Sequence, residues 1–173
     1  MKIDQAFLEI NDNLKRKFET SSDMWSGSPF AWIRSKPSRQ VGKIGERLVE
    51  QWLTVKGFSV RPSMNSSFDR FVGNVKLEIK FSTLWEGGFY KFQQLRNQDY
   101  DAVFCLGVSP HEVHGWVIPK SIAWEKSDGQ HKGKEALDTK WLTVYPDKVE
   151  DWLRPYGGNL YEVETALRKL LSE

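Results

Sequence analysis

The sequence predicts an α/β fold in which a central mixed β-sheet is flanked by helices. Amphipathic segments with helical spacing lie at both ends of the chain, and short apolar or alternating segments typical of strands lie between them. Residues that favour turns separate these segments. The resulting order of helix, helix, several strands and further helices is typical of a sheet with helices packed on its faces.

The composition is that of an ordinary globular domain. The chain has 173 residues, of which 39% are hydrophobic and 28% are charged, and its formal net charge is +2. This length fits one domain with a sizeable core, and the mild positive charge permits nucleic-acid binding without requiring it. We therefore expect one domain over residues 1–173, divided into a helix and loop (1–40), a core (41–145) and two C-terminal helices (146–173).

The sequence contains no signal for export and no membrane span. Charged residues interrupt the N-terminal segment, and no apolar run approaches the ~20 residues of a membrane-spanning helix. Cys105 is the only cysteine and lies in the apolar run AVFCLGV, which predicts a buried thiol. We therefore expect a cytoplasmic protein with no intrachain disulfide and no membrane contact.

The first forty residues are predicted to form a helix and a long loop. Apolar residues within 3–18 recur at steps of three and four, which predicts an amphipathic helix. Ser, Gly and Pro interrupt residues 20–40, which predicts a loop. This loop carries aromatic and basic side chains, namely Trp25, Phe30, Trp32, Arg34, Lys36 and Arg39.

The core is predicted to begin with a helix over residues 41–56 that ends at Gly57. At ~100° per residue, Glu46 lies at the border of the apolar face of this helix. A carboxylate in this position can face a cleft shared with the sheet. A boundary glutamate is also common in ordinary surface helices, so this position alone assigns no function.

Several short strands and two further helices are predicted after this helix. Residues 89–96 are predicted as another short helix. The last two helices are expected to begin at Pro146 and at Asn159, each with a glutamate at capping-box spacing. The predicted strands are 58–63, 75–82, 101–109, 114–119 and 141–146.

The strand at 75–82 alternates apolar and polar residues. Glu78 and Lys80 therefore point to the same face of the sheet, about 6–7 Å apart along the strand. Asp69 precedes Glu78 by nine residues, and a turn at residues 73–74 would fold it back beside this polar face. Taken alone, the strand is more typical of a solvated sheet face, because alternating Glu and Lys are common there.

These residue types are the ones that phosphodiester hydrolysis needs. Two carboxylates, Asp69 and Glu78, suit a hard cation such as Mg²⁺, which keeps several of its own waters. Such a cation polarises the phosphate and lowers the pKa of a bound water. Lys80 would hold that water and offset the charge that develops on phosphorus. The three histidines lack a nucleophile partner and zinc spacing, and we expect them at the surface.

The helix at 41–56 and the segments that follow it resemble a known family. GKIGERLVEQWLTVKGFSV, then an aspartate, then LEIKFS is similar to the PD-(D/E)xK nuclease superfamily, the fold of many restriction endonucleases. In that superfamily a helical Glu precedes an Asp on a strand, and (Asp/Glu)-x-Lys follows on the next strand. The resemblance covers roughly residues 41–125. The four positions are matched in order by Glu46, Asp69, Glu78 and Lys80.

The resemblance implies a restriction endonuclease-like core with a Mg²⁺ site, for which Mn²⁺ is an alternative cation. It implies hydrolysis that leaves a 5′-phosphate, and it places a glutamine near the site at Gln93 or Gln94. It assigns catalysis to Asp69, Glu78, Lys80 and Glu46. It assigns metal binding to Asp69, Glu78, Glu46 and the carbonyl of Ile79.

Basic and aromatic side chains indicate where DNA would bind, because cations contact phosphates and rings pack on sugars and bases. The expected DNA-contacting residues are Arg34, Lys36, Arg39, Lys43, Ser82, Gln93 and Gln94. A second loop, EKSDGQHKGKEALDTK, is also basic, but acidic residues dilute its charge. Either loop also fits an ordinary solvated loop.

The sequence therefore favours a single nuclease domain that acts as a Mg²⁺-dependent DNA endonuclease of the type II-like restriction class. Its substrate would be double-stranded DNA, and cutting both strands of a symmetric site favours a homodimer. One alternative is a structure-selective junction resolvase or repair nuclease. Another is a catalytically inactive DNA-binding or scaffolding domain, because a fold does not determine a substrate.

Overall fold

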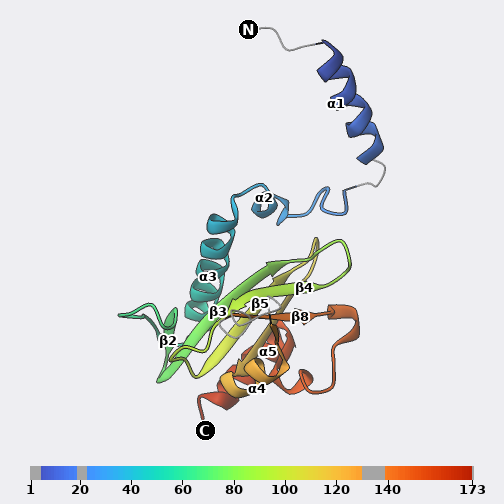
Figure 1. Cartoon of the computed structure of the whole chain (residues 1–173). Coiled ribbons are helices and arrows are strands. Elements are labelled where there is room, and N and C mark those ends of the chain that lie inside the picture. The colour runs from blue at the N-terminus through green and yellow to red at the C-terminus, as the bar shows by residue number, and fades with distance from the viewer. Residues whose placement is uncertain (1–4, 19–22, 130–138, 173) are drawn as a thin grey trace.

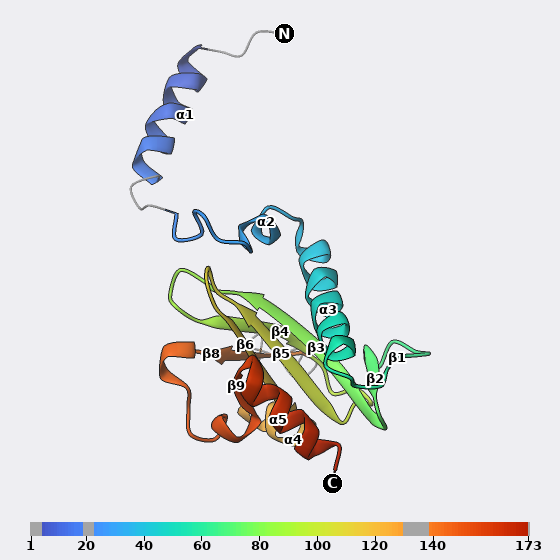
Figure 2. The same ribbon diagram turned by 180° about the vertical axis from the view of Figure 1, so that it is seen from behind.

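The computed structural model describes residues 5–18, 23–129 and 139–172. Helix α1 (Gln5–Phe18) confirms the predicted N-terminal helix, and Figures 1 and 2 both show it standing apart from the sheet. Its apolar residues Ile10 and Leu14 are exposed. Within the described ranges, no helix has both the length and the apolar character to cross a membrane.

The central sheet has six strands in the order β1-β2-β3-β5-β6-β9 (Figure 1). β3 and β5 run parallel and the other neighbouring pairs run antiparallel, so the sheet is mixed. With helices on its faces, this sheet confirms the predicted fold class. The strands are β1 (Val60–Pro62), β2 (Arg70–Val72), β3 (Val75–Thr83), β5 (Ala102–Val108), β6 (Val113–Pro119) and β9 (Gly157–Asn159).

One face of the sheet is covered by two amphipathic helices, α3 (Ser38–Val55) and α5 (Leu160–Leu170). Leu53 of α3 and Leu167 of α5 are buried in one apolar cluster with Ile79 of β3. The apolar residues of β3 therefore face the helices, and its polar residues face the other way.

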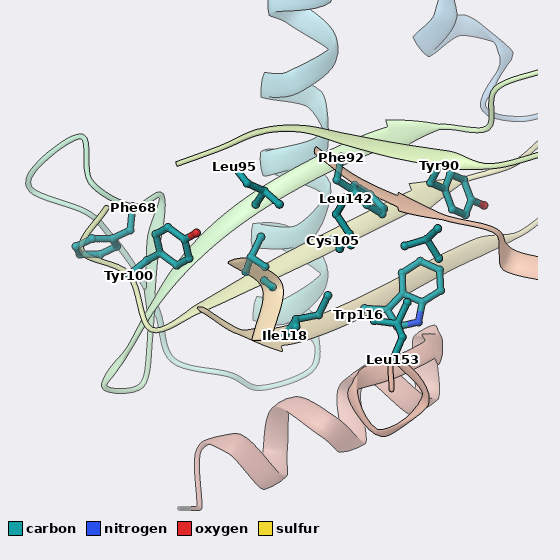
Figure 3. Packing of buried hydrophobic residues seen from close by; sticks show 13 residues of the cluster. Phe68, Tyr90, Phe92, Leu95, Tyr100, Cys105, Trp116, Ile118, Leu142 and Leu153 are labelled. Carbon is teal, nitrogen blue, oxygen red and sulfur yellow. The ribbon is translucent and has the colours of Figure 1, made fainter. Parts of the chain in front are cut away.

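The opposite face is covered by a three-stranded sheet in the order β4-β8-β7. Phe92 of β4 and Leu142 of β8 pack on Cys105 and Trp116 of the central sheet (Figure 3). Cys105 is fully buried, as predicted, and burial raises the pKa of its thiol. The elements on this side are β4 (Tyr90–Leu95), β7 (Asp128–Gly129), β8 (Lys140–Val144) and α4 (Lys120–Lys126).

The prediction of a helix over residues 89–96 is wrong, because this segment is strand β4. Tyr90 and Phe92 are completely buried and Lys91 between them is not, which is the period of a strand. The segment pairs with β8, some fifty residues later in the chain. A window this short does not separate the two periods, so the distant partner decides the structure.

The predicted loop over residues 20–40 is more ordered than expected in its described part. It contains helix α2 (Ala31–Arg34), and α3 begins three residues earlier than predicted. Trp25 and Ile33 are 2% and 1% exposed. Burial of these two side chains offsets the entropy lost on ordering the segment.

The helix expected from Pro146 does not form. Two 3₁₀ turns, Pro146–Lys148 and Arg154–Tyr156, stand in its place. Pro155 would remove a backbone donor and clash with the preceding turn of a continuing α-helix. The last helix begins as predicted, because Asn159 and Glu162 form a capping box at the start of α5.

The prediction that all histidines lie at the surface holds for His111 and is wrong for His114; His131 lies outside the described residues. The ring of His114 stacks on Trp116, and its Nδ1 is 2.8 Å from the hydroxyl of Tyr90. Burial lowers the pKa of His114.

Candidate active site

A tight hairpin brings Asp69 beside β3. Gly73 turns the chain with a φ of 57°, which a glycine adopts without strain. The β2–β3 ladder ends with Arg70 opposite Leu77. Asp69 follows on directly: its N–H donates to the Leu77 carbonyl (3.0 Å), and its Oδ2 accepts from the N–H of Ile79 (2.7 Å). The predicted return of Asp69 to this strand is thus present.

Glu78 and Lys80 extend from the same face of β3. The Nζ of Lys80 lies 2.7 Å from Oε1 of Glu78, and their side chains are only 19% and 12% exposed. A solvated sheet face would leave both side chains in water. These two instead form a largely buried ion pair on the face of β3 that is not covered by helices.

Ile79 links the core to the candidate site. Its side chain is 5% exposed and packs with the helices on the far face of the sheet. In a strand, the N–H and C=O of one residue point to the same side. Because the Ile79 N–H points to Asp69, its carbonyl faces the same edge of β3, beyond the end of the ladder with β2.

Glu46 reaches this edge from α3. Burial raises the pKa of Glu46, and the charge of Asp69 raises it further, whereas Arg70, Lys80 and Lys43 act in the opposite direction. Glu50, one turn later, is held by Arg70 at 2.9 Å. The helix therefore contributes one carboxylate to the edge of β3 and ties a second to the base of the hairpin.

The carboxylates influence one another. Burial raises the pKa of Glu78, the neighbouring Lys80 lowers it, and Asp69 and Glu46 raise it again. The net pKa lies above the usual value because burial and the two carboxylates outweigh the lysine. A bound cation would reduce the electrostatic repulsion between these carboxylates.

We expect Glu46→Gln to raise the thermal stability at about pH 8 by about 1–3 °C and to leave it unchanged at about pH 4. The folded-state pKa of Glu46 is raised, so the ionised carboxylate opposes folding once the pH exceeds that value. Thermal melts at the two pH values measure the difference. Glu125→Gln, in an exposed position on α4, is the matched control. A loss of stability at the higher pH would contradict the burial argument.

The donor set fits Mg²⁺ in its usual coordination. Among the residues that the structure describes, no three side chains of His, Cys, Asp or Glu are placed to hold a metal ion together. Mg²⁺ does not need such a cage, because it binds through one or two carboxylates and keeps waters and substrate oxygens. Asp69 and Glu78 each use one oxygen in the contacts above, and the other oxygen of each remains for a cation.

A groove of 580 Å³ runs along this edge. Glu46, Ile79 and Lys80 line it, whereas Asp69 and Glu78 do not line it and contact Ile79 and Lys80. Residues from the N-terminal segment and from β4 complete its walls. Those among the predicted DNA contacts are Arg34, Lys36, Ser82, Gln93 and Gln94.

The predicted DNA contacts are not equally placed. Lys36 is exposed in the groove, whereas Arg34 is held by Asp23 at 3.1 Å. Arg39 is exposed on α3, and neither it nor Lys43 lines this groove. Lys43 instead lines a separate apolar groove on α3 with Trp32. The structure thus brings Arg34 and Lys36 to the candidate groove, whereas Arg39 and Lys43 do not line it.

Three of the predicted contacts lie on β3 and β4. Ser82 is 5% exposed, and its hydroxyl donates to the Thr83 carbonyl and accepts from the Lys91 N–H, so it joins the two strands. Gln93 and Gln94 are exposed at a bulge in β4. Gln94 has a φ of 57°, an uncommon backbone conformation for a residue other than glycine.

The sequence did not anticipate one basic and one aromatic side chain of the groove. Lys91 and Trp85 line it from β4 and from the turn before β4. If residues 90–95 had been predicted as a strand, Lys91 would have been placed on the face opposite the apolar side chains of Tyr90 and Phe92. In the second basic loop, Lys126 is exposed at the end of α4, and residues 130–138 lie outside the described residues.

No family model matches the chain, and no curated protein matches it. Among solved structures, the chain is similar to a bacterial homing endonuclease, I-Ssp6803I, with 14% sequence identity and a TM-score of 0.47. The match covers 79% of this chain and 94% of that chain. At this identity the likeness is one of fold alone.

Proposed function

We propose that this protein is a Mg²⁺-dependent DNA endonuclease. The observation that carries the proposal is the meeting of Glu46, Asp69 and the Glu78–Lys80 pair at one edge of β3, beside a groove with basic walls. Three acidic side chains and one lysine, all partly withdrawn from water, are costly to a domain that only binds DNA. Phosphodiester hydrolysis would use each of these four side chains.

Each residue of the candidate site would have its own role in phosphodiester hydrolysis. Asp69, Glu78 and the Ile79 carbonyl would hold the cation, which when bound would supply Lewis acidity and a more acidic water. Lys80 positions the attacking water and offsets the charge that develops on the phosphate oxygens. Glu46, which lines the groove from α3, would orient water or hold a second cation. The groove that Lys80 and Lys36 both line would receive the scissile phosphate.

A type II-like restriction endonuclease is the first candidate within this proposal. Cutting both strands of duplex DNA at a symmetric site requires two copies of the site, so a homodimer belongs to this candidate. A cytoplasmic location belongs to it as well. A structure-selective resolvase or repair nuclease is the second candidate, which is favoured by the exposed Trp85 at the end of the groove.

Incubation with a panel of DNA molecules tests the proposal. We expect cleavage of DNA with Mg²⁺, none with a chelator, and a loss of about a thousandfold in Asp69→Asn, because this change removes the charge that holds the cation. A discrete band pattern on plasmid DNA indicates the restriction candidate, and cleavage of branched or gapped DNA alone indicates the structure-selective one. Full activity in Asp69→Asn would rule out this site. DNA binding without cleavage would indicate an inactive binding domain.

A further inference from the structure

An exposed tryptophan lies at one end of the candidate groove. Trp85 is in the turn between β3 and β4, and 42% of its surface is exposed. It lines the groove that Lys80 lines and also an adjoining hollow of 690 Å³, to which Trp25 and Arg34 contribute. The two hollows are therefore continuous along Trp85 and Arg34.

The chain's own residues support one part of this ring and leave the rest to solvent. The ring of Phe89 lies 5.6 Å from that of Trp85 and is tilted by 31°. Phe89 in turn lies 5.5 Å from Tyr145 at the end of β8. Lys91 has its Nζ 5.3 Å from the centre of the Trp85 ring and 3.5 Å from that of Trp141. The tryptophan is held in position before any ligand binds.

The charges around Trp85 suit a polyanion. Lys91 and Lys36 line the groove, and no carboxylate of the described residues forms an ion pair with either of them. Two acids, Asp23 and Glu86, line the adjoining hollow, and Asp23 is paired with Arg34. The groove itself is lined by one acid, Glu46, and by four cations, Arg34, Lys36, Lys80 and Lys91. Positive charge therefore predominates on the side of Trp85 that leads to Lys80.

We propose that Trp85 stacks an unpaired DNA base, with Lys91 on the adjoining phosphate. An aromatic ring beside cations is the usual platform for single-stranded nucleic acid, because every base presents a π-face to it. A base inside a duplex does not present that face. This inference rests on the proposed function and favours its structure-selective candidate, whose substrate would be duplex DNA that adjoins an unpaired segment.

Equilibrium binding without turnover tests the inference. Fluorescently labelled DNA is titrated with the full chain in the presence of a chelator, using a blunt duplex and the same duplex with a single-stranded tail. We expect wild type to prefer the tailed DNA. Trp85→Ala should weaken binding of the tailed DNA by between about fivefold and a hundredfold and leave the blunt duplex within about twofold. Trp85→Phe should keep most of the preference.

The controls separate the possible failures. Tyr161→Ala removes an aromatic ring that is 78% exposed on α5 and should change neither affinity. An equal loss of affinity for both DNA molecules would overturn the role of Trp85 in base stacking. No loss of affinity for the tailed DNA would overturn it as well, and would indicate that the exposed Trp85 binds a protein partner instead. Cleavage by wild type with Mg²⁺ is measured in parallel. Its absence would overturn the nuclease proposal and leave the binding comparison intact.

Discussion

Lys80→Met should abolish Mg²⁺-dependent DNA cleavage, with a loss of about a thousandfold or more, while DNA binding stays within a few-fold of wild type. Removing a group that positions water or stabilises developing charge costs about 10²–10⁴ in rate. Methionine keeps an unbranched apolar side chain, shorter than lysine by the terminal nitrogen, in a place where the side chain is only 19% exposed. The loss would therefore report on the ammonium group rather than on packing.

Lys76→Met is the matched control for this experiment. Lys76 lies on the same polar face of β3, four residues earlier, where its Nζ is 2.8 Å from the exposed Asp99. It is not in the groove, so cleavage should remain near the wild-type rate. Rates under single-turnover conditions, with binding measured separately in Ca²⁺, distinguish the chemical step from affinity. Equal losses in both variants would mean that β3 contributes general charge rather than a catalytic lysine.

Gly45→Ala should destabilise the protein by about 1–3 kcal/mol and reduce cleavage by at least about tenfold. An added Cβ would lie 2.2 Å from the Cβ and 2.3 Å from the Cγ of Phe81 on β3. Both atoms are close to the backbone of the strand, so α3 or β3 has to move. Because Glu46 is the next residue on α3, this movement displaces it from the candidate site.

Gly42→Ala provides the comparison within the same helix. Nothing lies within 4 Å of the Cβ that would be added there. Alanine favours a helix over glycine by about 1 kcal/mol, so this variant should be more stable than wild type. Urea unfolding measures both changes. If both variants were stabilised alike, the close contact of α3 with β3 would not be what positions Glu46.

Much of the candidate site could be predicted because its signals are local. The alternation of β3 places Glu78 and Lys80 on one face whatever surrounds the strand, since successive side chains point to opposite sides. The spacing of α3 likewise places Glu46 at the border of an apolar face. The return of Asp69 needs only a short hairpin with a glycine at its turn, and Gly73 supplies it.

Other features could not be predicted because distant segments decide them. Residues 90–95 are a strand because they pair with β8, and this pairing turns Lys91 toward the groove. The fold also separates residues that looked alike in the sequence: Arg34 and Lys36 line the candidate groove, and Lys43 lines a separate groove on α3.

By itself, the sequence determined on which face of its helix or strand each acidic and basic side chain lies. The period of a helix or strand depends only on neighbours along the chain, so this placement needs no distant contact. Only the tertiary structure decided which of these side chains share a groove and how deeply they are buried. Depth of burial depends on the second sheet and on the packing of α3 against β3, which are contacts between segments far apart in the chain. Those contacts turned an alternating strand that also fits a solvated surface into a largely buried Glu78–Lys80 pair beside Asp69.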